Sequence, residues 1–192
     1  MANERLSKLE RKQSIQQITR QLFLTKGFRQ TTMQDIVKAT GLSFGGLYYH
    51  YRQPQEILVD LLQAGNQERL TRMTQALTQL TNPQPLSTLA ELIVDKLLAE
   101  NEDIALYVLL LQEVKRDPDL AQVYQTLKAD AYRELQALCQ HFELPHIDMP
   151  HFELLTDLIN GFYLTSELLG TRHHALPYRQ SLIQLVLEIF SL

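Results

Sequence analysis

Residues 31–51 read TTMQDIVKATGLSFGGLYYHY, and this segment contains the most informative local signals in the chain. Thr32 and Asp35 have the spacing of a capping box, in which each side chain accepts a hydrogen bond from the backbone N–H of the other residue. This pattern predicts a short helix that ends at Gly41, where a positive φ costs little and the chain can reverse direction. Ser43 is a typical N-cap residue for a second short helix. Two short helices joined by a tight turn are the pattern of a helix-turn-helix motif.

The second short helix is expected to have an unusual exposed face. At about 100° per residue, and with Leu47 directed inward, Gly45 and Tyr49 point outward. Gly46 and Tyr48 flank this outward face. A glycine within a helix costs up to about 1 kcal/mol relative to alanine, so two of them are unexpected in a purely structural helix. The pattern favours close approach of another molecule to this backbone.

The remaining sequence has the apolar spacing of further helices and no convincing strand pattern. Gly27 ends the first helix, and Pro54 fits the first turn of another because its missing N–H leaves no hydrogen bond unmade there. The sequence therefore predicts an all-α protein of nine helices, with a three-helix helix-turn-helix domain at residues 1–53 and a six-helix bundle at 54–192. The expected helices lie near residues 4–26, 33–40, 43–51, 54–80, 87–100, 103–115, 117–142, 151–172 and 177–191, with a loop over 145–150.

The composition excludes several classes of protein. The 192 residues include 7 glycines and 7 prolines, too few for a loop-rich β-sandwich or a collagen-like repeat. The longest apolar run, Ile104 to Leu111, has eight residues, against the roughly 20 that a membrane-spanning helix needs. The N-terminal sequence is charged and lacks the apolar core of a signal peptide. Cys139 is the single cysteine and cannot form an internal disulfide. We therefore expect a soluble, cytoplasmic protein that does not enter a membrane.

Charge is distributed unevenly along the chain. The formal net charge is -4 at pH 7, yet residues 1–52 carry nine Lys or Arg against three acidic residues, a net charge of +6. The remaining 140 residues carry nine Lys or Arg against nineteen acidic residues, a net charge of -10. A basic N-terminal segment on an acidic body is typical of a protein whose smaller part binds phosphate groups, although charge alone names no partner.

Residues 15–51 resemble the DNA-binding domain of TetR-family transcriptional regulators. The resemblance rests on the Gly-x-Ser-x-Gly-x-Leu-Tyr-x-His-aromatic core that runs from Gly41 to Tyr51. It implies that the second short helix lies in the major groove of double-stranded DNA, with some of its residues near base edges and others on phosphate. The residues near base edges would be Gln34, Phe44, Gly45 and Tyr49. The phosphate contacts would be Thr32, Tyr48 and His50. Ser43 and Gly46 complete the DNA-binding set.

The sequence departs from the family pattern at three positions. Phe44 stands where these regulators commonly carry a lysine or another polar residue, and Pro54 stands where a phosphate-binding lysine is expected. Val37 replaces a small alanine at the contact between the two short helices. Phe44 is about 60° from Leu47 around the helix, so packing and contact with a thymine methyl group both remain open.

The basic residues at the N-terminus also allow two interpretations. They form either a solvated face of the first helix or an arm that follows the DNA backbone. These residues are Arg5, Lys8 and Lys12.

The body offers candidates for a ligand pocket and for a dimer interface. Polar-tipped side chains on helices that would surround a central cavity are the ligand-binding candidates, although most such side chains are core residues. They are Tyr107, Tyr124, Asn160 and Tyr163. The last two long helices carry more apolar surface than one subunit is expected to hide, which predicts a four-helix interface with a second copy. The expected interface residues are Phe152, Leu155, Ile159, Phe162, Leu182, Leu185 and Ile189.

Reactive residues form no convincing site. His141, His146 and His151 recur every five residues, whereas metal ligands on one helix face stand three or four residues apart. We expect no metal and no other cofactor. The sequence has no Gly-rich phosphate loop, no Ser-His-Asp order and no paired carboxylates, so we do not expect an enzyme.

The sequence as a whole predicts a homodimeric, sequence-specific DNA-binding regulator, a repressor that a small-molecule ligand releases. Two copies of the head would read half-sites about 34–36 Å apart, or a multiple of that, in a near-palindromic operator. The alternative is a small-ligand or metal sensor whose head has weak or lost DNA binding. Only Pro54 and Phe44 support that alternative.

Overall fold

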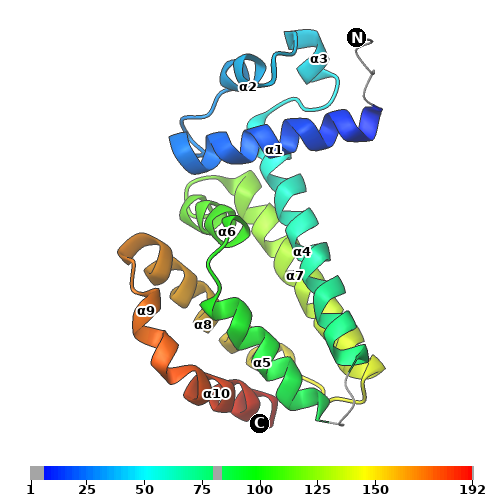
Figure 1. Ribbon diagram of the computed structural model, residues 1–192, viewed down its shortest axis with the longest axis vertical. Coiled ribbons are helices and arrows are strands. Elements are labelled where there is room, and N and C mark those ends of the chain that lie inside the picture. The colour runs from blue at the N-terminus through cyan, green and yellow to red at the C-terminus, as the bar shows by residue number, and fades with distance from the viewer. Residues whose placement is uncertain (1–6, 80–83, 192) are drawn as a thin grey trace.

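The computed structural model describes residues 7–79 and 84–191, and no strand occurs in these two ranges. All nine expected helices are present, which confirms the all-α fold, and α9 is an additional short helix (Figure 1). Residues 4–6 of the first expected helix and residue 80 of the fourth lie outside the described ranges. The helices are α1 (Lys8–Lys26), α2 (Met33–Thr40), α3 (Phe44–Tyr48), α4 (Pro54–Thr78), α5 (Pro85–Leu98), α6 (Glu102–Glu113), α7 (Pro118–His141), α8 (Met149–Leu169), α9 (Arg172–Ala175) and α10 (Arg179–Ser191), with a 3-10 turn at Leu176–Tyr178.

Most local signals in the head have the expected effect. Thr32 and Asp35 form the reciprocal capping box of α2, and Gly41 ends that helix with φ of 68°. The Ser43 side chain caps α3 by accepting a hydrogen bond from the backbone N–H of Gly46. Pro54 stands in the first turn of α4. These elements depend on residues a few positions apart, which is why the sequence predicts them well.

Two helix boundaries differ from the expected ones. The second short helix ends at Tyr48 and not at Tyr51. The chain turns after Tyr48, and the Tyr51 side chain is buried in the core. Helix α8 begins at Met149, inside the expected loop over 145–150, because Asp148 caps it and Pro150 fits its first turn.

The head is the three-helix unit α1 to α3, with α2 and α3 lying over α1 (Figure 1). Its centre contains Ile15, Phe23, Ile36 and Leu47, none of which is more than 1% exposed. Apolar burial therefore fixes the side of α3 that faces inward, and leaves the other side to solvent.

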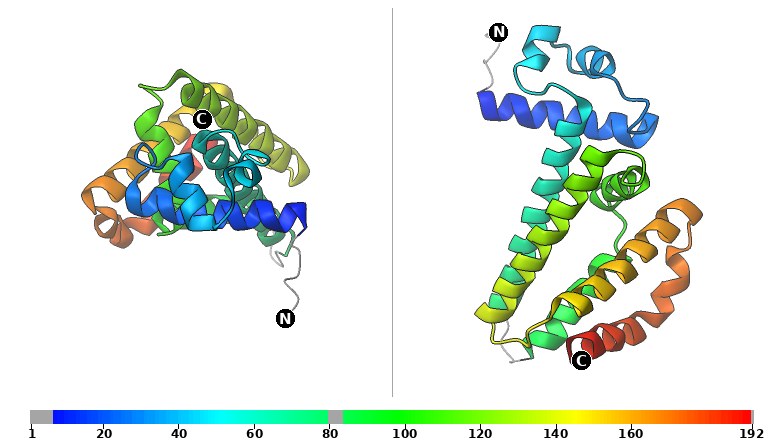
Figure 2. Two further views of the ribbon diagram at one scale, coloured as in Figure 1. Left: turned by 90° about the horizontal axis from the view of Figure 1, so that it is seen from above. Right: turned by 180° about the vertical axis from the view of Figure 1, so that it is seen from behind.

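Helix α4 joins the head to the body. It begins beneath α1 and runs beside α7 to the far end of the molecule (Figures 1 and 2). Ile57, Leu58, Leu61 and Leu62 of its first turns belong to the same apolar cluster as the centre of the head. That cluster continues into α6 and α7, so head and body share one core.

Polar contacts add to the attachment of the head. Arg20 of α1 donates a hydrogen bond to Asp103 of α6 at 2.7 Å. Arg29, in the turn after α1, pairs with the buried Glu113 at the end of α6. Gln21 adds a hydrogen bond to Glu102 at 2.8 Å. Helix α6 therefore contacts the head through several polar groups.

The rest of the body is a second apolar cluster. It is formed mainly by α5, α8 and α10, with the ends of α4 and α7. None of the helices in the described ranges combines the length and the apolar character that crossing a membrane requires.

Candidate DNA interface and ligand cavity

Helix α3 presents an open face with aromatic side chains around a glycine. Leu47 is fully buried, whereas Phe44, Tyr48 and Tyr49 are 50%, 49% and 69% exposed. No heavy atom would lie within 4 Å of a Cβ atom added at Gly45. The expected inward and outward sides of this helix are therefore confirmed, and the backbone at Gly45 is accessible to a large partner.

The position of Phe44 was open between core packing and exposure. Its ring stacks on Tyr48, one turn later, with centroids 6.4 Å apart and an angle of 22° between the planes. Half of the side chain is exposed, so Phe44 packs on another surface residue and not in the core. The pair forms an apolar edge that suits contact with a thymine methyl group.

The basic N-terminal part of α1 lies beside the end of α3. The Lys8 ammonium is 5.0 Å from the centroid of the Tyr49 ring. Burial lowers the pKa of His50, and the nearby charges of Lys8, Lys12 and Arg11 lower it further. His50 therefore lies in a positive field and keeps an uncharged ring, which can still donate one hydrogen bond. Arg5 is outside the described residues.

Tyr51 fixes the end of the recognition segment. Its hydroxyl donates to Asp60 of α4 at 2.8 Å and accepts a hydrogen bond from Gln16 of α1. Lys12 forms an ion pair with the same carboxylate at 2.6 Å. The residue that follows the two candidate phosphate ligands Tyr48 and His50 is thus tied to both α1 and α4, which limits the movement of α3.

The two remaining candidates lie on α2. Thr32 is exposed, but its hydroxyl already bonds to Asp35, as the backbone N–H of Thr32 does. Asp35 in turn forms an ion pair with Lys26 at 2.6 Å. A phosphate at Thr32 would have to share these groups. Gln34 is exposed, on the first turn of the same helix.

Replacing Tyr48 by Phe, or His50 by Ala, tests the assignment to phosphate. We expect each change to weaken binding by about tenfold, because a hydrogen bond to a charged group contributes about 1.5 kcal/mol or more. Specific and random DNA should be affected alike, since phosphates carry no sequence information. Fluorescence anisotropy with both DNAs at one salt concentration measures the ratio of the affinity for specific DNA to the affinity for random DNA. A large fall in that ratio for both variants would mean that they read bases.

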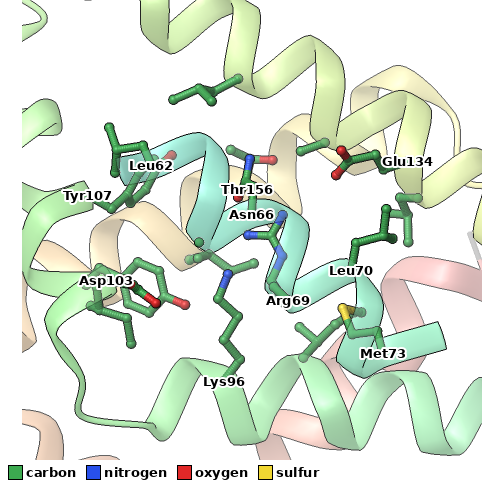
Figure 3. A pocket seen from close by; sticks show the side chains of 18 of the residues that line it. Leu62, Asn66, Arg69, Leu70, Met73, Lys96, Asp103, Tyr107, Glu134 and Thr156 are labelled. Atoms are coloured by element: carbon green, nitrogen blue, oxygen red, sulfur yellow. The ribbon is translucent and has the colours of Figure 1, made fainter. Parts of the chain in front are cut away.

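The body contains a partly open cavity of about 450 Å³ between α4, α5, α6, α7 and α8 (Figure 3). This volume lies in the usual range for small-molecule sites, roughly 300–1,000 Å³. Tyr107, Asn160 and Tyr163 line the cavity. Tyr124 does not line it, but its hydroxyl accepts a hydrogen bond from the Asn160 amide at 2.9 Å. Tyr107 donates to the carbonyl oxygen of the same amide at 3.1 Å. The four predicted residues thus lie together, and their role in binding stays a prediction.

The sequence analysis did not predict the charged residues on the cavity wall. Arg69 of α4, Lys96 of α5, Asp103 of α6 and Glu134 of α7 all line it. Charged residues on a helix are usually solvated, so residue type alone does not predict that these four line a cavity. The spacing of residues on α4, however, does indicate it. Asn66 and Arg69 continue the face that Leu62 and Met73 define, at spacings of three and four residues.

The predicted dimer residues require a correction. Phe152, Leu155 and Ile189 are at most 6% exposed because they pack into the cluster of α5, α8 and α10, so their surface is already covered. Ile159, Phe162 and Leu182 are partly buried and pack against the same or a neighbouring cluster. Only Leu185 of the seven is exposed. The prediction overlooked α5, which packs against both helices and covers their inner faces.

Within the described ranges, no group of three or more His, Cys, Asp and Glu side chains has the geometry to hold a metal ion. The ring of His151 lies 2.6 Å from the carboxylate of Asp148, the residue that caps α8. Cys139 is buried, and burial raises the pKa of its thiol. Neither residue belongs to the cavity or to the exposed face of α3.

A helix-turn-helix head with an open recognition helix, on a helical body with an internal cavity, defines a DNA-binding class of protein. Residues 17–61 match the family described as bacterial regulatory proteins, tetR family. The head therefore contains the DNA-binding domain of TetR-family regulators.

Two relatives each resemble part of the chain. The HTH-type transcriptional repressor KstR2 of Mycolicibacterium smegmatis is 28% identical over 112 residues, which are 58% of this chain and 54% of that protein. The uncharacterized HTH-type transcriptional regulator YfiR of Bacillus subtilis is 31% identical over 64 residues, 33% of this chain and 31% of that protein. The aligned part thus spans about half of the first relative and a third of the second.

Similarity of fold extends over the whole chain. The structure of Salmonella enterica GusR superposes with a TM-score of 0.76 at 21% identity, over 99% of this chain and 100% of that one. The fatty acid degradation regulator FadR of Bacillus halodurans has a TM-score of 0.65 at 14% identity, over 96% and 97%. At these identities the likeness establishes the fold and no ligand.

Proposed function

We propose that the protein is a homodimeric transcriptional repressor that binds a near-palindromic operator and is released by a small molecule in the body cavity. The exposed face of α3 beside the basic start of α1 is the observation that carries this proposal. Residues 1–53 form the domain that binds double-stranded DNA in the cytoplasm. Residues 54–192 form the domain that binds the ligand and the second subunit. Repression is supported by the relative KstR2, whose name is that of a repressor.

The dimer interface we propose is the outer face of α8 and α10. Leu154, Leu158 and Leu185 are 46%, 43% and 41% exposed there. A Cβ atom added at Gly161, on the same face of α8, would meet nothing within 4 Å, so a second helix could approach closely. These residues replace the buried members of the predicted set. Pairing with the same face of a second copy would cover them in a four-helix arrangement.

Asp103 is suited to connect the cavity with the head. Its carboxylate lines the cavity and pairs with Arg20 on α1 at 2.7 Å. It also lies close to Gly65 of α4, where an added Cβ atom would stand 3.3 Å from the carboxyl carbon. A ligand that displaces Asp103 would therefore act on α1 and α4 together. Such a ligand shifts the head only if it binds the two arrangements unequally.

Replacing Asp103 by Asn should weaken this connection. We expect ligand and operator to oppose each other by about 1–3 kcal/mol in the wild type, or 5- to 150-fold in affinity, with the same factor measured in either direction. In Asp103→Asn the factor should fall below about threefold, because the charge pair with Arg20 is lost. A ligand found by thermal-shift screening, titrated with and without operator DNA, provides the measurement.

Glu102→Gln is the matched control. Glu102 is the preceding residue, lies 3.7 Å from the same Arg20, and does not line the cavity. The control should keep most of the coupling. A coupling that survives in Asp103→Asn and disappears in Glu102→Gln would contradict the proposed connection.

Selection of genomic fragments by the full-length protein, at a stated salt concentration, tests the function itself. We expect enriched fragments that share a near-palindromic site with half-site centres about 34–36 Å apart or a multiple of that. Enrichment that follows no sequence would contradict the proposal. It would leave the cavity as the working part of a ligand sensor without useful DNA binding.

A further inference from the structure

The charged groups on the cavity wall do not balance one another. Most are satisfied by partners, in ion pairs between Asp103 and Arg20, Asp95 and Arg179, Lys128 and Glu153, and Arg72 and Glu68. Arg69, Lys96 and Glu134 form no ion pair with any residue in the ranges 7–79 and 84–191. These three side chains are therefore available to interact with a ligand in the cavity.

The two cations converge. Arg69 extends from α4 and Lys96 from α5 toward the same part of the cavity (Figure 3). Burial lowers the pKa of both side chains, and the charge of Arg69 lowers that of Lys96 further. Two like charges that are partly removed from water and face each other destabilise the empty protein. An anion placed between them would relieve both the desolvation and the repulsion.

Glu134 does not supply that anion. It approaches from α7, and none of the ion pairs among the described residues joins its carboxylate to Arg69, although its charge raises the pKa of the guanidinium group. Its Oε2 atom is buried without a hydrogen-bond partner in the described structure. Burial raises the pKa of this carboxyl group, and the nearby charge of Arg69 lowers it. A partly buried acidic group on the cavity wall would repel a strongly charged ligand, and it therefore favours a monoanion over a dianion.

We propose that the cavity binds a small organic carboxylate, with its carboxylate group between Arg69 and Lys96 and its apolar part along Leu70, Met73, Leu138 and Phe152. A guanidinium group donates two parallel hydrogen bonds to a carboxylate, and an ammonium group adds a third donor. This assignment rests on the proposed ligand-controlled repressor, since it names the class of its ligand.

The test compares matched probes on the full-length protein without DNA. Octanoate and 4-phenylbutanoate are compared with their amides and with octylammonium, by titration calorimetry and thermal shift. We expect each carboxylate to bind at least tenfold more tightly than its amide, and octylammonium not to bind. Equal binding of acid and amide, or no binding of either acid, would overturn the inference.

Variants then test the two cations. Arg69→Gln and Lys96→Met should each weaken carboxylate binding at least tenfold, while the melting temperature of the empty protein stays equal or rises because a partly buried cation without an ion-pair partner is removed. Lys96→Arg keeps the charge and should stay within about fivefold. Arg72→Gln is the matched control. Arg72 lies one turn from Arg69 and lines the same cavity, but pairs with Glu68, so this variant should change binding less than threefold.

The measurement separates this inference from the proposed function. A carboxylate that binds through Arg69 and Lys96 but leaves operator affinity unchanged supports the site and contradicts ligand release. An operator that is released by an uncharged compound, in a protein that binds neither acid, contradicts the carboxylate site and supports ligand release. Carboxylate binding that survives in both Arg69→Gln and Lys96→Met would also overturn the inference.

Discussion

Replacing Gly45 by valine is expected to reduce operator affinity by about a hundredfold or more, a loss of roughly 2.7 kcal/mol. The branched side chain would stand at the centre of the exposed face of α3, where the backbone is open in the free protein. A helix that lies in the major groove has no room for added atoms at its closest point. The free energy of unfolding should stay within about 1 kcal/mol, as for other surface substitutions. Anisotropy titration and thermal unfolding measure the two quantities.

Gly45→Ala provides a graded control. It adds one carbon atom at the same place and improves helix propensity, so it should lose less affinity than the valine variant. An operator affinity that is unchanged in Gly45→Val would show that this part of α3 does not touch DNA. A large loss of stability in both variants would instead mean that Gly45 has a structural role that the open space around it does not indicate.

Replacing Leu158 by glutamate is expected to convert the dimer to monomers and to reduce operator affinity by about a hundredfold. Leu158 is 43% exposed on the outer face of α8, and a carboxylate buried there between two subunits would have no partner to offset its lost hydration. A monomer binds one half-site at a time, and so loses the gain from joining two heads. Sedimentation equilibrium and anisotropy, at the same protein concentrations, check the two effects.

Leu176→Glu is the control for this variant. Leu176 is 54% exposed and belongs to the 3-10 turn, outside both α8 and α10. The control should remain a dimer with unchanged operator affinity. Dimerisation that persists in Leu158→Glu and fails in Leu176→Glu would move the interface away from the outer face of α8 and α10.

The features that the sequence predicts well are those that depend on neighbouring residues. The capping box at Thr32, the left-handed turn at Gly41 and the cap at Ser43 each involve a few consecutive positions. The inward direction of Leu47 follows from helix geometry once these signals place the helix. A DNA-binding head could therefore be recognised from one short stretch.

The body is harder to predict because its sites depend on which helices pack together. Leu155 and Leu154 are adjacent in sequence, yet one is 5% and the other 46% exposed, and the helices that pack against α8 decide which. Arg69 and Lys96 are 27 positions apart and meet because α4 and α5 flank the same cavity. The sequence around either residue does not indicate that the other lies in the same cavity. Amphipathic helices in the body each have several possible neighbours, and the sequence alone does not choose among them.

The apolar cluster that crosses from the head into α4, α6 and α7 has a consequence for modularity. A chimaera that joins this head to another regulator's body between residues 53 and 54 would separate Ile15 and Leu47 from Ile57 and Leu58, which share their core. The transferred head would expose apolar residues that pack against α4, α6 and α7 in this protein, and the new body would have to replace those contacts. We therefore expect a chimaera to keep these contacts with α4 only when its crossover point lies beyond the first turns of that helix.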